Sequence, residues 1–404
     1  MRRVVVTGAG VVSPIGMNLE DFRASLLAGR GAIGPIQSFD ASEFVCQVAA
    51  EIHGYDPKAH FSAAELTLMD RFAQFALLSA REAMTHSGLV IDDELAERAS
   101  VIHGTGIGGQ ITQDEAYEKI IVQGGKRLHP FTVPKLMTNS GTSQISMAFG
   151  IKGPSFTTST ACSSAGHAIC LAYMLIRQGM VDAALTGGAE ACLTSGTIRS
   201  WEGLRVMARD TCRPFSHRRG GMVMGEGAGT LVLETLEHAQ ARGANILAEV
   251  IGMGMSADAG NIVQPDKDGA ARALRWALQD GGLAPEDVQY INAHGTGTPQ
   301  NDPTETAAIR DIFGMHADEL AVSSTKSMHG HALGAAAALE SIATLVALQE
   351  QVAPPTINFE APDPECDLDY VPNEPRPMAI DVALTNSFAF GGLNTVVAFK
   401  RFAG

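Results

Sequence analysis

Short apolar runs and amphipathic segments alternate along the chain, and this alternation predicts an α/β protein. A strand that is buried on both faces reads as an unbroken apolar run, which is typical of a parallel sheet covered by helices. A helix with one buried face instead repeats its apolar residues every three to four positions. The predicted strands are residues 3–7, 99–103, 181–186, 230–234, 248–254, 288–293, 320–323, 381–385 and 395–400. The predicted amphipathic helices are residues 19–27, 63–87, 141–149, 236–242, 269–280 and 305–313.

Two further helical segments are apolar on nearly every side. One begins just after Cys162, and the other spans residues 333–349, just after His331. A helix without a polar face is normally buried, so we place both helices between two sheets. Each follows a short strand, which suggests that the chain repeats one arrangement. We therefore predict a pseudo-duplicated, layered α/β unit in which residues 1–245 and 246–404 form two intertwined halves.

Composition and charge exclude several classes of protein that could share this pattern. Of the 404 residues, 45% are hydrophobic and 18% are charged, which is typical of a globular protein. The excess of 44 acidic over 29 basic residues argues against nucleic acid or an anionic membrane as the partner. The six cysteines show no paired spacing, and neither a signal peptide nor a run of about 18 apolar residues is evident. We expect a cytoplasmic protein with reduced thiols and no membrane span.

Cys162 lies where a predicted strand becomes a helix, and this position favours reactivity. The unpaired N–H groups and partial positive charge of a helix start stabilise a thiolate. Cysteine is also commonly an inert, buried, small hydrophobic residue. Position alone therefore does not decide between a catalytic and a structural role for Cys162. His294 ends a predicted strand, where open α/β sheets place ligand crevices. His331 lies at the mouth of the second apolar helix, so duplicated halves would make Cys162 and His331 face each other.

The segment Gly8-Ala-Gly10-Val-Val-Ser13 imitates a dinucleotide-binding fingerprint after a strand. Serine replaces the third glycine, Pro14 stands where the helix should open, and no acidic residue ends a second strand at the expected distance. We therefore do not expect nucleotide binding at this segment.

Five short motifs occur in order along the chain. They are Thr-Ala-Cys162-Ser-Ser-Ala, Gly187-Gly-Ala-Glu, Asn-Ala-His294-Gly-Thr-Gly-Thr, Lys326-Ser-Met-His-Gly-His331 and Asn386-Ser-Phe-Ala-Phe-Gly-Gly-Leu-Asn394. Together they resemble the β-ketoacyl-acyl-carrier-protein synthases, above all the type II elongating enzymes and their nodulation-protein relatives. The resemblance runs from residue 3 to about residue 401. It implies a thiolase-like fold of five layers, αβαβα, usually as a homodimer, and a condensing acyltransferase.

The resemblance also implies a reaction, decarboxylative Claisen condensation, that extends a fatty acyl or polyketide chain by two carbons. Cys162 would hold an acyl group received from the phosphopantetheine of acyl carrier protein. The backbone N–H groups of Cys162 and Phe390 would form the oxyanion hole. His294 and His331 would stabilise the enolate that forms when the malonyl carrier loses carbon dioxide. No metal and no redox cofactor is implied.

Further roles follow from the same resemblance. Lys326 would adjust the electrostatics around His331, with Glu305 and Glu340 as carboxylates of that network. A bare Glu340 on an apolar helix would be costly to bury without such a partner. Pantetheine and the acyl chain would be bound by Thr296, Thr298, Ile107, Trp201, Phe388 and Arg205, and Phe390 would gate the entry of malonyl groups.

The chain departs from the family pattern at several positions. Two departures, His329 and Leu393, replace a residue that is usually Thr. Two others, Ala337 and Ala389, replace a residue that is usually Gly, and the alanine at 389 should stiffen the gating loop. Trp201 stands where the elongating enzymes tend to carry phenylalanine, so we hypothesise a primer other than a long saturated chain.

The surface expected to bind the carrier also departs from the family. Residues 62–67, Ser-Ala-Ala-Glu-Leu-Thr, lack the basic residues that the family often carries there. An acidic carrier would instead meet Arg205, with weak or specialised recognition as the consequence. The other basic candidates are Lys126, Arg127 and Arg199.

Other functions remain compatible with parts of the pattern. A non-elongating partner subunit, like a chain-length factor, is one, although such partners usually lack the cysteine. A coenzyme A-dependent thiolase or acyltransferase is another. A cysteine hydrolase or a nucleotide-binding oxidoreductase fits the motifs less well.

Overall fold

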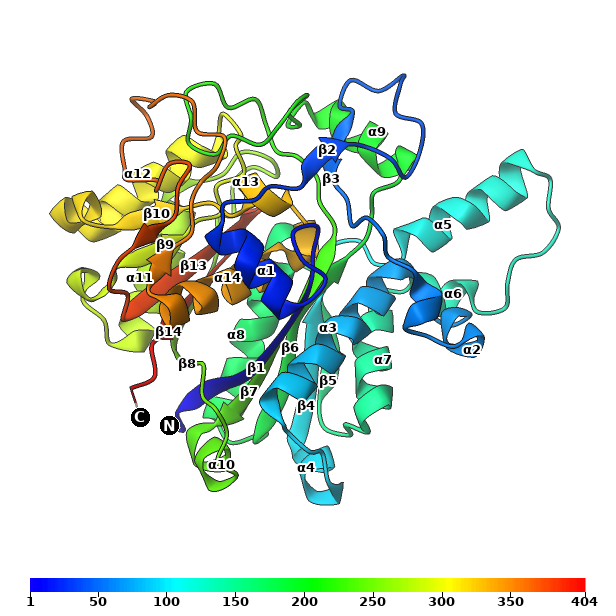
Figure 1. Ribbon diagram of the computed structural model, residues 1–404, viewed down its shortest axis with the longest axis horizontal. Helices are drawn as coiled ribbons and strands as arrows, with labels where there is room; N and C mark the ends of the chain where they lie inside the picture. Colours follow the sequence, from blue (N-terminus) through cyan, green and yellow to red (C-terminus); the bar gives the residue numbers. More distant parts are fainter. Residues whose placement is uncertain (404) are drawn as a thin grey trace.

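A mixed sheet of ten strands runs through the whole molecule. The computed structural model describes residues 1–403 (Figure 1). The strand order is β10-β9-β13-β14-β8-β1-β7-β6-β4-β5. The strands are β1 (Val4–Val12), β4 (Ala99–Gly104), β5 (Ser155–Thr158), β6 (Ala183–Glu190), β7 (Gly227–Thr235), β8 (Ala248–Ala257), β9 (Tyr290–Asn292), β10 (Ala321–Ser323), β13 (Val382–Ala389) and β14 (Leu393–Lys400). Two short pairs stand apart: β2 (Ile33–Pro35) with β3 (Val48–Ala50), and β11 (Val352–Ala353) with β12 (Arg376–Pro377).

The two ends of the sheet repeat one topology, as the sequence pattern predicts. In the first, β1 pairs antiparallel with β7 and β7 with β6, whereas β6, β4 and β5 run parallel. In the second, β8, β14, β13, β9 and β10 follow in the same order with the same directions. We expected two separate sheets, but β1 and β8 join them through the pairs Val4 with Val250, Val5 with Glu249 and Val6 with Ala248.

Helices cover and separate the two ends of the sheet, which gives the predicted five layers. The central layer holds α8 (Ser164–Arg177) and α14 (Ala336–Glu350), and each contacts strands of both ends. On the outside, α3 (Arg71–Ser87) covers β1 and β7, while α11 (Lys267–Gly281) covers β8 and β14 and packs on α12 (Asn301–Phe313). The central helices are apolar all round because sheet lies on both sides of them.

The remaining helices are short. They are α1 (Leu19–Leu27), α2 (Ala63–Leu66), α4 (Asp93–Arg98), α5 (Gln110–Tyr117), α6 (Thr132–Leu136), α7 (Ser140–Phe149), α9 (Ser195–Leu204), α10 (Leu236–Ala241) and α13 (Lys326–His329). In Figure 1, α5 and the loop after it extend away from the body of the molecule.

Two differences from the predicted elements have clear causes, and a third concerns helices that were not predicted. The single helix expected at 63–87 is two helices, because Asp70 caps α3 by accepting the N–H of Phe72 and so starts a new helix. The strand expected to end at Thr186 continues to Glu190, since Gly187 lets β7 approach closely: a Cβ there would lie 1.9 Å from the Gly229 oxygen. The helices α5, α6 and α9 lie in segments that we predicted as loops or left unassigned.

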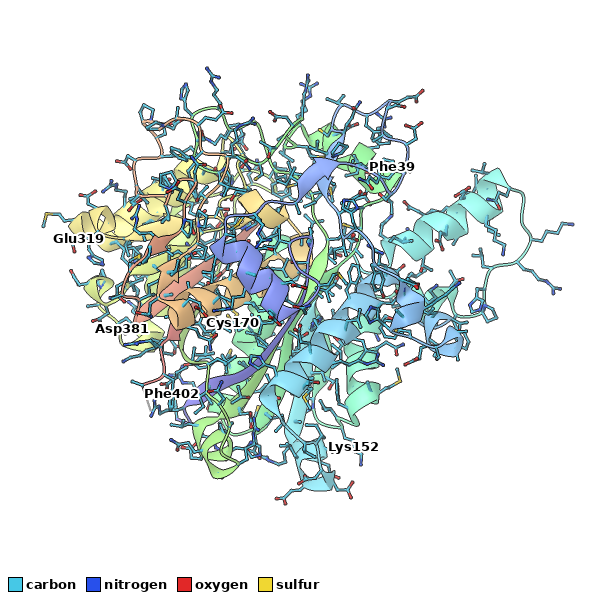
Figure 2. The ribbon with its side chains drawn as sticks, in the orientation of Figure 1. Phe39, Lys152, Cys170, Glu319, Asp381 and Phe402 are labelled. Carbon is cyan, nitrogen blue, oxygen red and sulfur yellow. The ribbon has the colours of Figure 1, made fainter. Side chains whose placement is uncertain are left out.

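One segment, Leu333–Glu350, is long and apolar enough to span a membrane, although we expected no such run. Within the protein 89% of it is buried, and its place between the two ends of the sheet identifies it as the core helix α14 with the turn before it. Figure 2 shows the same for the other central helix: Cys170 of α8 lies inside, whereas Lys152 and Glu319 lie at the periphery.

Candidate active site

The two central helices begin alike, with a 3-10 turn whose first residue has a positive φ. The turn Ala161–Ser163 precedes α8 and starts with φ 50° at Ala161, and the turn Leu333–Ala335 precedes α14 and starts with φ 41° at Leu333. Positive φ is uncommon for residues other than glycine, so the shared conformation indicates equivalent positions. Cys162 therefore corresponds to Gly334, and His331 lies just before the second turn rather than in it.

The structure brings together the three reactive side chains predicted from the sequence. The sulfur of Cys162 and nitrogens of His294 and His331 all lie within 4.8 Å of one another. All three residues are buried. The two imidazole rings meet edge to face, with their centroids 5.5 Å apart. A nucleophile and two hydrogen-bonding imidazoles thus surround one small space.

This space is a cavity of about 50 Å³ with a mostly apolar lining. Its walls include the expected residues Phe388, Phe390 and Trp201, and its rim carries the expected Thr296 and Thr298. The two threonine hydroxyls lie 3.0 Å apart, and that of Thr298 also accepts the N–H of Asn301 at the start of α12. Hydroxyls at the rim suit a polar linker such as pantetheine, and the apolar wall suits an acyl chain.

Burial affects the pKa of the Cys162 thiol more than its position at the helix start does. Removal from water raises the pKa of its thiol to about 11, against the opposing effects of the Lys326 ammonium and the Phe390 N–H. Our expectation of a thiolate favoured by the helix start is therefore wrong for the resting protein. The thiol must give up its proton during reaction, and the two nearby imidazoles are the groups able to accept it.

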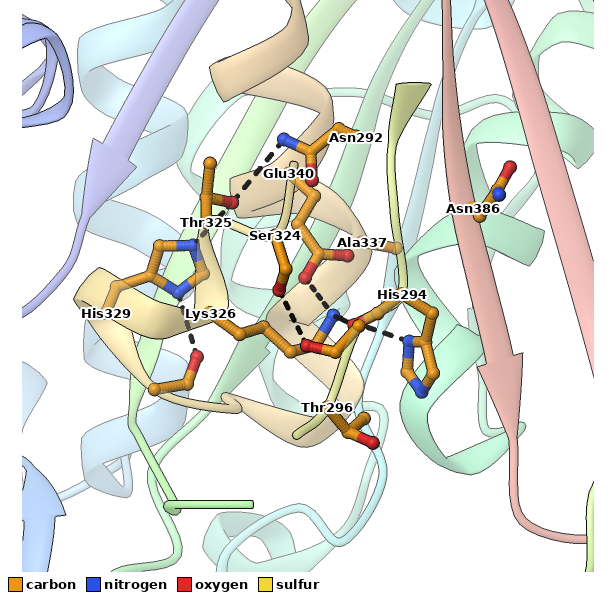
Figure 3. A network of polar contacts seen from close by, with 12 residues as sticks. Asn292, His294, Thr296, Ser324, Thr325, Lys326, His329, Ala337, Glu340 and Asn386 are labelled. Atoms are coloured by element: carbon orange, nitrogen blue, oxygen red, sulfur yellow. Dashed lines mark hydrogen bonds and ion pairs between the residues drawn. The ribbon is translucent and has the colours of Figure 1, made fainter. Parts of the chain in front are cut away.

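Lys326 lowers the pKa of His331 through its charge, as we expected of its electrostatic effect, and it also contacts His294 directly (Figure 3). Its ammonium donates to the carbonyl oxygen of His294 at 2.6 Å and lies 3.3 Å from Nδ1 of the same residue. An ammonium can only donate, so Nδ1 accepts and the proton of the neutral ring sits on Nε2. Lys326 also forms a fully buried ion pair with Glu340. His294 thereby presents an N–H to the cavity.

Both histidines are neutral at physiological pH. Burial, the Lys326 charge and the neighbouring imidazole hold the pKa of His294 well below its usual range. Burial and Lys326 lower the pKa of His331 in the same way. The backbone of His331 is fixed, since its N–H donates to Val223 at 2.7 Å and its carbonyl accepts from Gly225 at 3.0 Å. Its Nδ1 has no hydrogen-bond partner among residues 1–403.

Glu305 and Glu340, the two carboxylates expected to support the site, are both buried beside its histidines and Lys326. Glu305 accepts the backbone N–H groups of His294 and Gly295, each at 2.8 Å, and so holds the turn that carries His294. Burial raises the pKa of Glu305, and these hydrogen bonds oppose that rise. Burial likewise raises the pKa of Glu340 to about 7, against the effect of Lys326.

Two predicted substrate-binding residues lie outside the cavity wall. Ile107 packs into the apolar cluster around Cys162 but does not line the cavity. Arg205 is exposed at the end of α9, with φ 57°, and does not line the cavity. Among the departures, His329 is buried and bonds to Thr325 and to the Gly330 carbonyl, so it shapes the backbone before His331.

Glu190 has a role at the site that its motif alone does not indicate. Its buried carboxylate accepts from the Thr105 hydroxyl and from the N–H groups of Gly106, Ile107 and Gly334. It therefore ties the loop after β4 to the start of the second central helix. The available signal was an acidic residue ending a fully apolar strand, where an unpaired charge would be costly.

Cys162, His294 and His331 are also potential metal ligands. One thiol and two imidazoles within 4.8 Å form a set that Zn²⁺ accepts. A metal held there would occupy the nucleophile and both histidines, so it would prevent these side chains from reacting as free groups.

Comparison with known proteins agrees with this geometry. The family model "Beta-ketoacyl synthase, N-terminal domain" matches residues 1–239, and "Beta-ketoacyl synthase, C-terminal domain" matches residues 247–360. The chain therefore belongs to the β-ketoacyl synthase family of condensing enzymes, which have the thiolase-like fold and act as acyltransferases.

Individual relatives cover the full length of the chain. Nodulation protein E of Rhizobium sp. is 46% identical, over 99% of both chains. The 3-oxoacyl-[acyl-carrier-protein] synthase 2 of Synechocystis sp. is 44% identical, over 99% of this chain and 98% of its own. Among solved structures, the ishigamide ketosynthase/chain length factor superposes with a TM-score of 0.95 at 38% identity, over 100% of both chains.

Proposed function

We propose that this protein is a 3-oxoacyl-[acyl-carrier-protein] synthase that extends an acyl chain held on Cys162. The observation that carries the proposal is the convergence of Cys162, His294 and His331 on one buried cavity. The relative from Synechocystis sp. acts, by its name, on acyl carrier protein. The presence of Cys162 argues against a non-elongating partner subunit, because such a subunit needs no nucleophile.

The first half-reaction transfers the acyl group to Cys162. The thiol passes its proton to a neutral imidazole, and the sulfur attacks the carbonyl carbon of the acyl thioester. The N–H groups of Phe390 and of Cys162 itself face the sulfur, where they can stabilise the oxyanion. The carrier leaves as a free thiol after taking up the proton, and the acyl chain remains on Cys162.

The second half-reaction forms the new carbon–carbon bond. The malonyl thioester loses carbon dioxide, and the electrons of the broken bond form an enolate. His294 donates its Nε2 proton in a hydrogen bond to the thioester oxygen, and His331 donates to the same oxygen. The enolate carbon attacks the acyl carbonyl, and Cys162 leaves as a thiolate that is then reprotonated. The product is a β-ketoacyl chain on the carrier, two carbons longer.

The remaining features fit this role. Both halves, which we place at residues 1–245 and 246–404, are needed because Cys162 comes from one and the histidines from the other. We propose acyl carrier protein as the partner, phosphopantetheine as its substrate-bearing group, no resident cofactor, and a cytoplasmic location. Arg205 is an exposed basic candidate for binding the carrier, and Arg199 on the same helix is paired with Glu202.

The test separates the two half-reactions by substitution. Cys162→Ala should abolish acylation and condensation but retain decarboxylation of the malonyl carrier, because the enolate site stays intact. His294→Ala should retain acylation and lose decarboxylation by about a hundredfold or more, as for other lost oxyanion donors. Decarboxylation that survives in His294→Ala, or condensation that survives in Cys162→Ala, would overturn the proposal. Equal turnover of free coenzyme A thioesters would instead support the thiolase-like alternative.

A further inference from the structure

The imidazole of His329 is fully buried behind the site and does not line the cavity. Burial and the Lys326 charge lower the pKa of His329 to about 3, so the ring is neutral, with one donor and one acceptor nitrogen. Nδ1 lies 2.9 Å from the carbonyl oxygen of Gly330, and because a carbonyl oxygen only accepts, Nδ1 carries the proton. Nε2 then accepts the hydroxyl of Thr325 at 3.1 Å. The ring is therefore a fixed spacer between the residue before α13 and the residue after it.

The peptide unit between Gly330 and His331 is held at both of its polar groups. Its carbonyl oxygen accepts from His329, and its N–H donates to the carbonyl oxygen of Val223 at 2.7 Å. Gly330 has φ 69° and ψ −174°, a conformation open mainly to glycine, so the residue itself restricts the orientation of this peptide unit little. The two hydrogen bonds therefore set the direction in which the His331 side chain leaves the backbone.

The rings of His294 and His331 differ in how they are supported. Nδ1 of His294 lies 3.3 Å from the Lys326 ammonium. Nδ1 of His331 has no hydrogen-bond partner in the part of the chain that the structure describes, so the direction of this ring depends mainly on its backbone. A hydrogen bond weakens steeply when its donor turns away from the acceptor. A change in the backbone of His331 would therefore weaken its hydrogen bond to the enolate oxygen.

The ring of His329 is also connected to the strand that carries His294 (Figure 3). The hydroxyl of Thr325 donates to His329 and accepts from the side-chain amide of Asn292 at 3.4 Å. Asn292 is the last residue of β9, and His294 follows in the next turn of the chain. The same ring thus holds the backbone of His331 relative to the strand of His294. Two donors that share one oxygen need such a fixed relative position.

We propose that His329 is a positioning residue for decarboxylation: it clamps the peptide unit between Gly330 and His331 and so directs the His331 ring at the enolate oxygen. His329 itself touches no substrate and acts only through His331. This inference rests on the proposed condensing function.

The test measures decarboxylation of malonyl carrier in the Cys162→Ala background, in which only the enolate site acts. His329→Leu has a similar volume but neither hydrogen bond, and it should slow this rate by about ten- to a hundredfold, as for other misplaced groups. His329→Asn keeps an amide N–H close to the position of Nδ1 and should recover most of the rate. An unchanged rate in His329→Leu, or an equal loss in His329→Asn, would overturn the proposal.

A double-mutant cycle tests whether His329 acts through His331. When His331→Ala is already present, His329→Leu should cause no further loss of rate. A further loss of the same size as in the presence of His331 would overturn the proposal, because His329 would then act independently of that ring.

His103 provides the matched control. It is also a buried imidazole, its Nε2 lies 3.2 Å from the hydroxyl of Thr230, and it does not line the cavity. His103→Leu should keep the decarboxylation rate, with thermal unfolding showing that both leucine variants are folded. An equal loss in the two variants would reduce the effect to general destabilisation and overturn the clamp.

A measurement on the wild-type protein decides if His329→Leu does not fold. With ¹⁵N-labelled histidine, the signal of His329, identified by its loss in His329→Asn, should show the proton on Nδ1. A proton on Nε2 would overturn the clamp, because Nδ1 could not then donate to Gly330. Failure of the proposed function is distinct, since wild type would then form no acyl adduct on Cys162 and Cys162→Ala would not decarboxylate malonyl carrier.

Discussion

At the scale of single residues, the site depends on groups that burial keeps uncharged. Desolvation raises the pKa of the Cys162 thiol against the opposing effect of Lys326, whereas desolvation and the Lys326 charge together lower the pKa of both histidines. Lys326 then decides which nitrogen of His294 carries the proton. The sequence motifs identified these residues. They could not show that Lys326 contacts His294, because that contact depends on the relative positions of α13 and β9 in the fold.

The first prediction concerns the pH dependence of decarboxylation. A histidine with a pKa near 6.5 would gain its second proton as the pH falls through that value, and the rate would change there. Because the pKa of His294 lies well below its usual range, the neutral ring persists to lower pH. Malonyl decarboxylation by Cys162→Ala should stay level from about pH 8 to about pH 5.5. An inflection near the ordinary histidine value would show that the pKa of at least one of the two rings is not lowered as described.

The second prediction concerns the buried ion pair of Lys326 and Glu340, both fully buried. Lys326→Met leaves Glu340 without its partner and should destabilise the protein by about 3–5 kcal/mol. The double variant with Glu340→Leu should recover most of that loss, as chemical denaturation would show. Equal stability of Lys326→Met and wild type would mean that the pair contributes nothing. Even the stable double variant should lose decarboxylation, because His294 no longer has an oriented proton.

At the scale of elements, the start of α8 is held by close backbone packing. A Cβ on Gly104 would lie 2.4 Å from the carbonyl carbon of Ser164, and one on Gly188 would lie 2.7 Å from Cβ of Ala165. Strands β4 and β6 thus pack directly against the start of α8, next to the turn that carries Cys162. Hydrophobic periodicity predicted the strands and the two apolar helices from their burial. It could not predict the split at Asp70 or the continuation through Gly187, which depend on a single cap and a single close approach.

The third prediction tests this packing. Gly104→Ala should push the helix start outward, destabilise the fold by about 1–3 kcal/mol and slow acylation of Cys162. Gly220→Ala is the control, since a Cβ there meets nothing within 4 Å. Thermal unfolding and acylation rate should both distinguish the two variants. If Gly104→Ala behaved like the control, the mounting of Cys162 would not depend on this contact.

At the scale of the whole molecule, the duplicated topology places Cys162 and the histidines at the meeting of the two halves. The two apolar helices predicted this layered, duplicated architecture because they must be buried between sheets. The family resemblance then identified it as the thiolase-like fold. The sequence pattern did not predict the β1–β8 pairing that joins the two ends, because three residue pairs leave no distinct signal. Nor did it predict the projecting α5 arm, where Ile121 and Val122, just after α5, are exposed.

The fourth prediction concerns that arm and the edge strand β5. Exposed apolar side chains occur on both parts: Ile121 at 75% and Val122 at 77% follow α5, while Phe156 of β5 is 40% exposed and Met147 of the neighbouring α7 is 65% exposed. Exposed edges and apolar patches are typical of interfaces, so we propose that a second copy covers them. Sedimentation should give twice the chain mass of 42.4 kDa, and Phe156→Asp should reduce it to one chain. The control Trp276→Asp, on a distant exposed site, should remain a dimer, whereas a monomeric wild type would contradict the proposal.

The most direct test of the central claim is the intact mass of the protein after incubation with acyl carriers of different chain length. Wild type should gain the mass of one acyl group, Cys162→Ala should gain none, and malonyl carrier should then remove the adduct while β-ketoacyl carrier appears. The chain length that reacts best would show what space Trp201 leaves. An adduct that also forms on Cys162→Ala, or no adduct from any donor, would contradict the account.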